Sequence, residues 1–149
     1  MLGYWKMPEK TKESIVNGWL HTGDLGYMDK GGYLFLVDRK NDMIITGGEN
    51  VYPNEVENLL MAYPAVMETV VFGIPDQKWG ESVKAIIVLK PGKTATADEI
   101  IKYCKGKLAG YKCPKSIEFK DAIPKTAAGK ISRAALKKEY WKGQDKMIS

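Results

Sequence analysis

The stretch Val66-Met-Glu-Thr-Val-Val-Phe-Gly73 is rich in β-branched and aromatic residues, which predicts a strand. A second run of the same character, Val83-Lys-Ala-Ile-Ile-Val-Leu89, follows after the polar, glycine-containing segment 75–81. Pro91-Gly92 supplies a turn that ends the second run. The two runs therefore predict a pair of strands joined by a polar connection.

Helical patterns lie on both sides of this strand pair. Upstream, Pro53 suits the first position of a helix, and apolar residues follow at i, i+3, i+4 and i+7: Val56, Leu59, Leu60 and Tyr63. Downstream, the capping-box sequence Thr96-Ala-Asp-Glu99 opens a second predicted helix, which runs to about residue 108 and stops at Gly110. One face of that helix carries three apolar residues: Ile101, Cys104 and Leu108.

Three shorter elements complete the prediction. Strands are expected at 43–46 and 116–119, and a last helix is expected near 132–140, with Ser132 as its candidate N-cap. Together with the longer elements they predict an α+β fold, a short mixed sheet flanked by about three helices.

The first part of the chain has a different character. Asp29-Lys-Gly-Gly32 predicts a hairpin turn between strands at 25–28 and 33–37. Residues 39–149 are enough for one compact domain with a modest core, whereas residues 1–38 are too few to bury much surface alone. We therefore expect a domain boundary at about residue 38.

Composition excludes several classes of protein. The 149 residues are 44% hydrophobic and 28% charged, which is typical of a globular domain rather than a disordered chain. No apolar run is long enough to span a bilayer and the first residues do not form a signal peptide, so we expect a cytoplasmic protein. Cys104 and Cys113 lack metal-ligand spacing, which favours reduced, non-catalytic thiols and no metal site.

Positive charge is concentrated near the end of the chain. Residues 1–101 carry 10 Lys/Arg and 14 Asp/Glu, whereas residues 102–149 carry 13 and 4. A basic segment can bind nucleic acid, but these lysines are scattered singly, without the interleaved aromatic residues on which single strands stack. A small polyphosphate ligand is served equally well by such a surface, and we prefer that interpretation.

One lysine lies in a distinctive loop, Ile123-Pro-Lys-Thr-Ala-Ala-Gly-Lys-Ile-Ser-Arg133. Pro124 fixes one backbone angle and Gly129 permits a sharp turn beside Lys130, so the loop is expected to present that cation outward to a phosphate or carboxylate. The loop is not a P-loop, because Pro124 replaces the first glycine and Ile131 replaces the Ser/Thr that would bind Mg²⁺. An ordinary solvated lysine is the alternative.

Three further motifs precede this loop in a fixed order: TGDLGYMD at 22–29, GYLFLVDRKNDMI at 32–44 and GGENVYPNEVE at 47–57. With the Lys130 loop, they resemble the adenylate-forming superfamily, which includes acyl-CoA synthetases, adenylation domains of peptide synthetases and luciferases. The resemblance covers roughly residues 3–141, and PDQKWGESV at 75–83 is most similar to acid–CoA ligases.

The resemblance implies an activity and its nucleotide contacts. Such ligases join a carboxylic acid to AMP, release pyrophosphate and pass the acyl group to a thiol; fatty or aromatic acids are expected here. Lys130 matches the family's adenylation lysine, and Asp24 and Arg39 match contacts to the nucleotide ribose. A turn-capping Asp24 and a solvated Arg39 are the alternatives. Asn41 aligns with the hinge of the family, where Asp or Lys is usual, and asparagine tolerates unusual backbone angles.

The resemblance also implies a coenzyme A site. Gly47 and Gly48 are candidates for the pantetheine channel, because a thin arm passing along the backbone leaves no room for Cβ atoms. Trp79 matches an aromatic coenzyme contact, with a surface or core-edge indole as the alternative. Lys112 and Lys115 are weaker candidates for the coenzyme phosphates. Two acids at the start of the 53–63 helix, Glu55 and Glu57, are expected to complement its dipole only.

The implied organisation is a mobile C-terminal lid at 39–149, preceded by the tail of a large N-terminal domain at 1–38. The family's phosphate loop, acyl pocket and Mg²⁺-coordinating glutamate lie in that large domain, so we expect the isolated chain to be inactive. Partners are then the carboxylic acid, ATP, coenzyme A and the large domain. The alternative is a standalone binding module that lacks catalysis, with residues 1–38 as a candidate homodimer interface. A nucleic-acid binder is the least favoured class.

Overall fold

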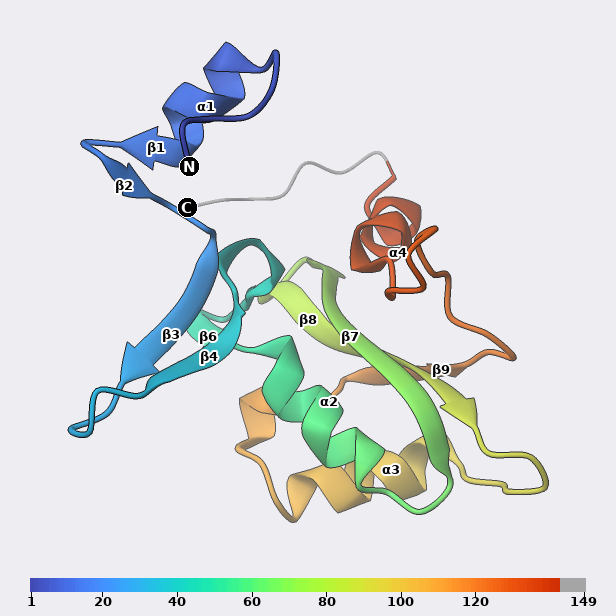
Figure 1. Ribbon diagram of the computed structural model, residues 1–149. Coiled ribbons are helices and arrows are strands. Elements are labelled where there is room, and N and C mark those ends of the chain that lie inside the picture. Colours follow the sequence, from blue (N-terminus) through green and yellow to red (C-terminus); the bar gives the residue numbers. More distant parts are fainter. Residues whose placement is uncertain (143–149) are drawn as a thin grey trace. The chain divides into compact units, whose positions relative to one another are not determined.

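A computed structural model describes residues 1–142 of the chain (Figure 1). The described backbone divides into two compact units, Met1–Asn41 and the residues from Asp42 onward. The units therefore meet three residues after the expected boundary at 38. That the first unit is the tail of a larger domain stays a prediction.

The first unit consists of short elements without an apolar core. Helix α1 (Pro8–Ser14) is followed by the small hairpin β1 (Ile15–Val16) and β2 (Trp19–Leu20), and then by the hairpin β3 (Asp24–Met28) and β4 (Leu34–Arg39). The turn at 29–32 forms as predicted, because the Asp29 carboxylate accepts the N–H groups of Gly31 and Tyr33.

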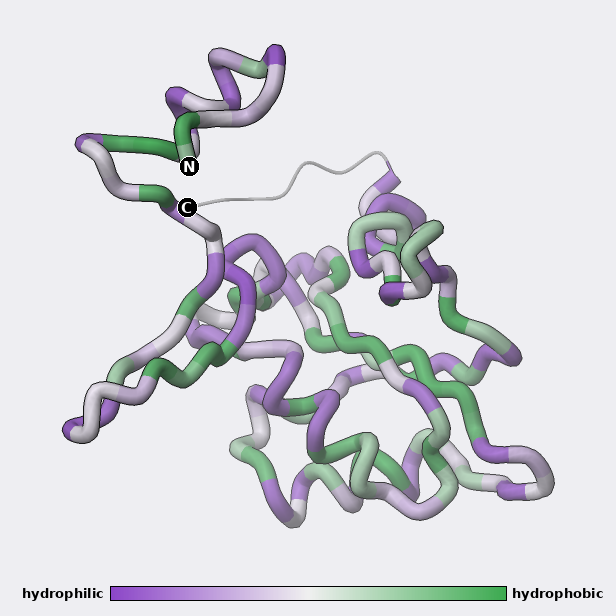
Figure 2. Tube along the Cα trace, in the orientation of Figure 1, coloured by the Kyte–Doolittle hydropathy of each residue, from purple (hydrophilic) through white to green (hydrophobic). Residues whose placement is uncertain are grey.

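Large apolar side chains of this unit face solvent. Figure 2 shows hydrophobic residues along β4, and Leu36 is 69% exposed. Trp5 and Trp19 are 86% and 77% exposed, and no apolar residue within 1–41 is buried. The hydrophobic effect therefore contributes little to the stability of this unit by itself.

The second unit is built on a five-stranded mixed sheet. It contains β5 (Ile44–Thr46), β6 (Glu49–Val51), β7 (Val66–Asp76), β8 (Gly80–Leu89) and β9 (Ser116–Phe119). Strands β6-β5-β8-β7 are joined in antiparallel pairs, whereas β9 lies parallel to β8. The predicted α+β class with a small mixed sheet is confirmed.

Helices cover both faces of this sheet (Figure 1). On one face, α2 (Pro53–Met61) and α3 (Ala97–Lys105) bury Val56, Leu60, Ile100 and Cys104 against the strands. On the other face, α4 (Arg133–Tyr140) inserts Leu136 beside Val70 and Phe72 of β7. Because successive side chains of a strand point to opposite faces, the adjacent apolar residues Val70, Val71 and Phe72 of β7 supply both cores.

Several sequence predictions need correction. The segment 75–81 is not a connection, because β7 and β8 continue in register through Asp76↔Gly80 and leave only residues 77–79 as a turn. Helix α3 ends at Lys105 rather than near 108, with Gly106 as its C-cap. Its buried face consists of Ile100 and Cys104, which lie one turn apart, whereas the predicted Ile101 is only half-buried.

The two predicted N-caps differ in outcome. The capping box at Thr96 forms in full, with reciprocal bonds between Thr96 and Glu99. Ser132 occupies the N-cap position of α4, but its side chain makes no capping bond.

Several short elements were not predicted: helix α1, strands β1, β2 and β6, and the 3-10 turns η1 (Lys40–Asp42) and η2 (Gly110–Lys112). Among the described residues, no helix has the length and apolar character needed to cross a membrane.

Candidate functional site

The Lys130 loop closes on itself through backbone hydrogen bonds. The Thr126 N–H donates to the Lys130 carbonyl (2.7 Å), and the Gly129 N–H donates to the Thr126 carbonyl (2.8 Å). Gly129 has a φ of +75°, which L side chains rarely adopt. Lys130 is exposed, and among the described residues its amine has no hydrogen bond or ion pair. The loop thus presents a cation with its full charge available to a ligand.

The entry to this loop is held by an ion pair. The Lys125 amine lies 2.7 Å from the Glu68 carboxylate of β7. Lys125 also pairs with Ile131 as an isolated antiparallel bridge, and the Ser132 N–H donates to the Pro124 carbonyl (2.9 Å). The two ends of the loop are therefore fastened together beside the sheet.

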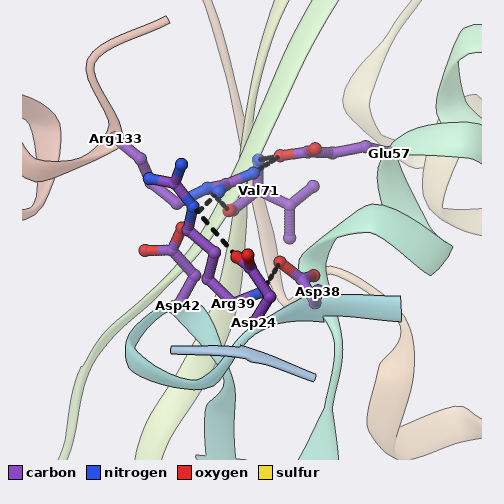
Figure 3. A network of polar contacts seen from close by, with 7 residues as sticks. All are labelled: Asp24, Asp38, Arg39, Asp42, Glu57, Val71 and Arg133. Atoms are coloured by element: carbon purple, nitrogen blue, oxygen red, sulfur yellow. Dashed lines mark hydrogen bonds and ion pairs between the residues drawn. The ribbon is translucent and has the colours of Figure 1, made fainter. Parts of the chain in front are cut away.

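Arg133 follows the loop directly and joins α4 to three other segments (Figure 3). Its Nε donates to the Val71 carbonyl (3.0 Å), its Nη1 to Asp42 Oδ2 (2.7 Å) and its Nη2 to Glu57 Oε1 (2.6 Å). Glu57 Oε1 also accepts the Val71 N–H (2.7 Å). The Arg133 side chain is only 17% exposed. Burial disfavours its charged form, but the Glu57 and Asp42 carboxylates outweigh burial and raise the pKa of the guanidinium.

The far end of α4 is held by a second polar cluster. The Tyr140 hydroxyl donates to Glu118 Oε2 (2.5 Å), and the Lys84 amine lies 3.0 Å from the same oxygen. The indole of Trp141 donates to the Gly73 carbonyl (3.0 Å). The hydrogen bond from Tyr140, helped by neighbouring lysine amines, lowers the pKa of Glu118 to about 2. Burial, together with the bond to Glu118, raises the pKa of Tyr140.

The candidate thiol-channel residues come together in the second unit. Gly47 and Gly48 form the turn between β5 and β6, with φ values of +60° and +84°. The Gly47 N–H donates to the Trp79 carbonyl (2.9 Å), and a Cβ on Gly47 would lie 2.7 Å from Cε3 of the Trp79 ring. A Cβ on Gly48 would meet nothing within 4 Å. The structure thus places Trp79, which is 42% exposed, against one glycine and leaves the other open.

Two lysines lie close to that indole. The amines of Lys78 and Lys115 are 4.7 and 5.9 Å from the Trp79 ring centroid, within the range of cation–π attraction. An aromatic ring with two cations over it, beside a turn without Cβ atoms, suits a slender chain that carries phosphate.

In the first unit, Asp24 and Arg39 lie opposite each other. They are cross-strand partners in the β3–β4 ladder, with Arg39 Nε 3.7 Å from Asp24 Oδ1 (Figure 3). The Asp24 N–H donates to Thr22 Oγ1 (3.1 Å), and the Lys40 N–H donates to the Gly23 carbonyl (2.8 Å). Both charged groups are exposed, so a carboxylate and a guanidinium are presented side by side. Asn41 is the last residue of this unit.

The structure revises the interpretation of the α2 acids. Glu57 does more than complement a helix dipole, because its carboxylate accepts from both Arg133 and the Val71 backbone. Glu55 forms a 2.8 Å ion pair with Lys112, so that this candidate phosphate ligand already has a carboxylate partner. Lys115 has no such ion pair among the described residues.

Among the described residues, the cysteines and acidic groups do not gather as potential metal ligands. Cys104 and Cys113 are free and buried, and burial raises the pKa of Cys104 to about 11, which disfavours the reactive thiolate. Within residues 1–142, no three His, Cys, Asp or Glu side chains lie together as potential metal ligands.

Sequence reasoning missed the Arg133–Asp42–Glu57 network. Its members come from segments separated by 15 to 91 positions, and no short motif joins them. One signal was available: Arg133 is the first residue of α4, where the helix dipole disfavours a cation. A positive charge in that position indicates a carboxylate partner elsewhere.

The chain is similar in sequence to a known protein family and to several ligases. Residues 55–130 match the family model described as the AMP-binding enzyme C-terminal domain. The chain is 50% identical over 139 residues to a long-chain-fatty-acid–CoA ligase of Bacillus subtilis, covering 93% of this chain and 25% of that protein. It is 47% identical over 140 residues to a feruloyl-CoA synthase of an Amycolatopsis species, covering 94% and 28%.

Solved structures match the fold closely. ATP-bound MatB from Rhodopseudomonas palustris is 40% identical, with a TM-score of 0.87, over 93% of this chain and 28% of that one. The apo structure of MatB is matched over the same shares at 41% identity, but with a TM-score of 0.70. The chain spans about a quarter of the length of these relatives.

Proposed function

This chain belongs to the family of AMP-binding enzyme C-terminal domains, and on that premise we propose that it is the C-terminal part of an acid–CoA ligase. The proposed ligase activates a carboxylic acid with ATP to an acyl-adenylate and transfers the acyl group to coenzyme A in the cytoplasm. Relatives named for long-chain fatty acids and for feruloyl-CoA favour a fatty or aromatic acid as substrate.

The observation that carries this proposal is the exposed amine of Lys130 on a glycine turn, which has no ion pair with any residue of the described part of the chain. In adenylation, negative charge accumulates where the carboxylate oxygen approaches the α-phosphate. A cation held in place before the reaction stabilises that charge more in the transition state than in the ground state. We assign this role to Lys130.

Asp24 and Arg39 are the proposed contacts to the nucleotide ribose. A carboxylate can accept hydrogen bonds from two hydroxyl groups at once, as the paired hydroxyls of a ribose require. The 3.7 Å separation of Arg39 Nε and Asp24 Oδ1 is long for a hydrogen bond, which leaves both groups available to a ligand.

The proposed path for the thiol arm lies along Gly47 and Gly48, beside Trp79. The open side of Gly48 accommodates a thin chain close to the backbone, and the exposed indole offers a surface for the coenzyme. Lys115 is then a better candidate for a phosphate contact than Lys112, whose amine is paired with Glu55. Mg²⁺, if required, is expected to bind residues outside this chain.

Asn41, at the junction of the two units, is the proposed hinge. In support, one relative matches this chain with TM-scores of 0.87 with ATP bound and 0.70 without ligand, at nearly equal identity. The two structures of that protein thus differ in how closely they match this chain. We propose that rotation at the hinge brings first the Lys130 loop and then the Gly47–Gly48 turn to the reacting atoms.

A chimera tests the assignment. This chain replaces the matched segment of the Bacillus subtilis relative, and ATP–pyrophosphate exchange measures adenylation. Lys130→Ala is expected to lower exchange by about 10²–10³-fold, as for loss of one preorganised donor. Thioester formation from supplied acyl-adenylate should be retained. Lys93→Ala, another exposed lysine, serves as the control and should leave both half-reactions unchanged. Equal loss of both half-reactions in Lys130→Ala would refute the role of Lys130.

The isolated chain is proposed to be inactive, because the acyl pocket and phosphate loop of such ligases lie in a large N-terminal domain. The exposed Trp5, Trp19 and Leu36 are consistent with a partner surface for that domain. The same observation favours the alternative of a standalone binding module that self-associates through residues 1–38. Pyrophosphate exchange by the isolated chain would contradict its proposed inactivity. Two results together would favour the alternative: the isolated chain forms a dimer as its concentration rises, and the chimera shows no pyrophosphate exchange.

A further inference from the structure

Arg133 is placed to control the geometry of the Lys130 loop. It lies three residues beyond Lys130, and its buried guanidinium makes hydrogen bonds to Val71, Asp42 and Glu57 (Figure 3). These acceptors belong to β7, to the first residue of the second unit and to α2. One side chain thus connects the loop exit to three separate parts of the same unit.

We infer that Arg133 is a positioning residue that fixes the Lys130 loop relative to Asp42. Asp42 is the first residue after the hinge position proposed above. A loop that is bonded to Asp42 through Arg133 therefore moves together with the backbone of Asp42. The role of the loop in adenylation rests on the proposed function. The mechanical link between Arg133, Asp42 and the loop is independent of the proposed function.

The closed shape of the loop transmits this constraint to Lys130. The ends of the loop are joined by the Lys125–Ile131 bridge and by the bond from the Ser132 N–H to the Pro124 carbonyl. Within it, the Lys130 carbonyl accepts the Thr126 N–H at 2.7 Å. A short, internally bonded loop has few independent torsions, so fixing its exit at Arg133 limits where the Lys130 backbone can lie.

Arginine is required by the arrangement of its acceptors. The planar guanidinium directs its N–H groups along fixed lines, and here they meet one carbonyl and two carboxylates. Lysine keeps the positive charge, but its amine is a single point and cannot reach all three directions. Arg133→Lys therefore separates geometry from charge, whereas Asp42→Asn keeps the shape of the partner and removes its charge.

Amide hydrogen exchange on the 149-residue chain tests the link. Arg133→Lys and Asp42→Asn are each expected to raise exchange of the Thr126 and Gly129 amides about tenfold or more, with smaller changes in the β7–β8 amides. In the double variant the increase in exchange should be close to the larger of the two single increases and far below their product, because both substitutions break the same connection.

A core variant supplies the control for a purely structural effect. Leu136→Val loosens α4 through its apolar contact and leaves Arg133 intact. If it raises loop exchange relative to sheet exchange as much as Arg133→Lys does, positioning by Arg133 is refuted. Unchanged loop amides in both Arg133→Lys and Asp42→Asn would also refute it, as would independent effects in the double variant.

Measurements on the chimera keep this inference separate from the proposed function. Arg133→Lys should lower kcat for adenylation by about tenfold with little change in the KM for ATP, while thioester formation from supplied acyl-adenylate is retained. If Lys130→Ala leaves adenylation intact, the proposed function fails even where the exchange results stand. If Lys130→Ala abolishes adenylation and Arg133→Lys changes neither exchange nor kcat, only the positioning role fails.

Discussion

Adding one methyl group at Gly47 should reorganise the candidate thiol channel. The residue has a φ of +60°, and a Cβ there would lie 2.7 Å from Cε3 of the Trp79 ring, well inside van der Waals contact. Gly48 also has a positive φ, +84°, but open space where its Cβ would be. Gly47→Ala and Gly48→Ala therefore differ mainly in the contact with the indole.

The expected magnitudes follow from these two terms. A left-handed conformation costs an L residue roughly 1–2 kcal/mol, and both variants incur that cost. In Gly47→Ala the ring must also leave its packed position, and partial loss of its apolar burial would add roughly 1 kcal/mol. We expect a loss in the free energy of unfolding of about 2–3 kcal/mol for Gly47→Ala and about 1–2 kcal/mol for Gly48→Ala.

Urea unfolding of both variants measures this difference, and the indole N–H resonances report the position of Trp79. Gly47→Ala should shift the Trp79 resonance strongly, whereas Gly48→Ala should leave it nearly unchanged. Equal stabilities together with an unshifted Trp79 resonance in Gly47→Ala would show that the glycine is not needed for close approach of the ring. That result would remove the packing argument for this turn.

Three further outcomes are expected in the second unit. Thr96→Ala should lower the free energy of unfolding by about 1 kcal/mol, through loss of the N-cap of α3, as measured by the urea midpoint. Leu136→Ala should lower it by about 2–5 kcal/mol, because a fully buried side chain is removed between α4 and the sheet, and calorimetry would detect this. The Glu118 carboxyl has its pKa lowered from 4.5 to about 2, chiefly by the Tyr140 hydroxyl, so its stabilising contribution is complete above about pH 4.5 and is lost as the pH falls toward 2. Urea midpoints across that range should fall less in Glu118→Gln, and an identical fall would contradict the assignment.

Elements set by local pattern could be predicted from the sequence. The capping box at Thr96, the turn at 29–32 and the strand at 116–119 each depend on residues close together in the chain, and each forms as expected. The segment 75–81 looked like a loop because it is polar. Pairing between the ends of β7 and β8 overrides that preference, with Pro75 opposite Glu81. Glu81 is also buried, and its carboxylate accepts the N–H of Ile45 in β5.

In the candidate site, too, single residues could be predicted from the sequence, whereas contacts between distant segments could not. Single residues such as Lys130, Gly47 and Trp79 could be named from motifs, but the packing of Trp79 on Gly47 joins positions 32 apart, and only the fold reveals it. The contacts of Arg133 are longer in range, reaching back to Asp42. Such contacts leave no periodic pattern in a single sequence, since each partner is an ordinary charged residue in its own segment.

The attachment of α4 combines two kinds of interaction that do different things. Leu136 packs in the apolar core, and this non-directional contact would tolerate small rotations or shifts of the helix. Arg133 demands three acceptors in fixed directions. Replacing a buried ion-pair network with apolar side chains often leaves stability unchanged or raises it by about 1–4 kcal/mol, so stability alone does not account for the charges at this end of α4. Their directional requirement, three residues from Lys130, accounts for them better: they set the position of the helix and so of the loop that precedes it.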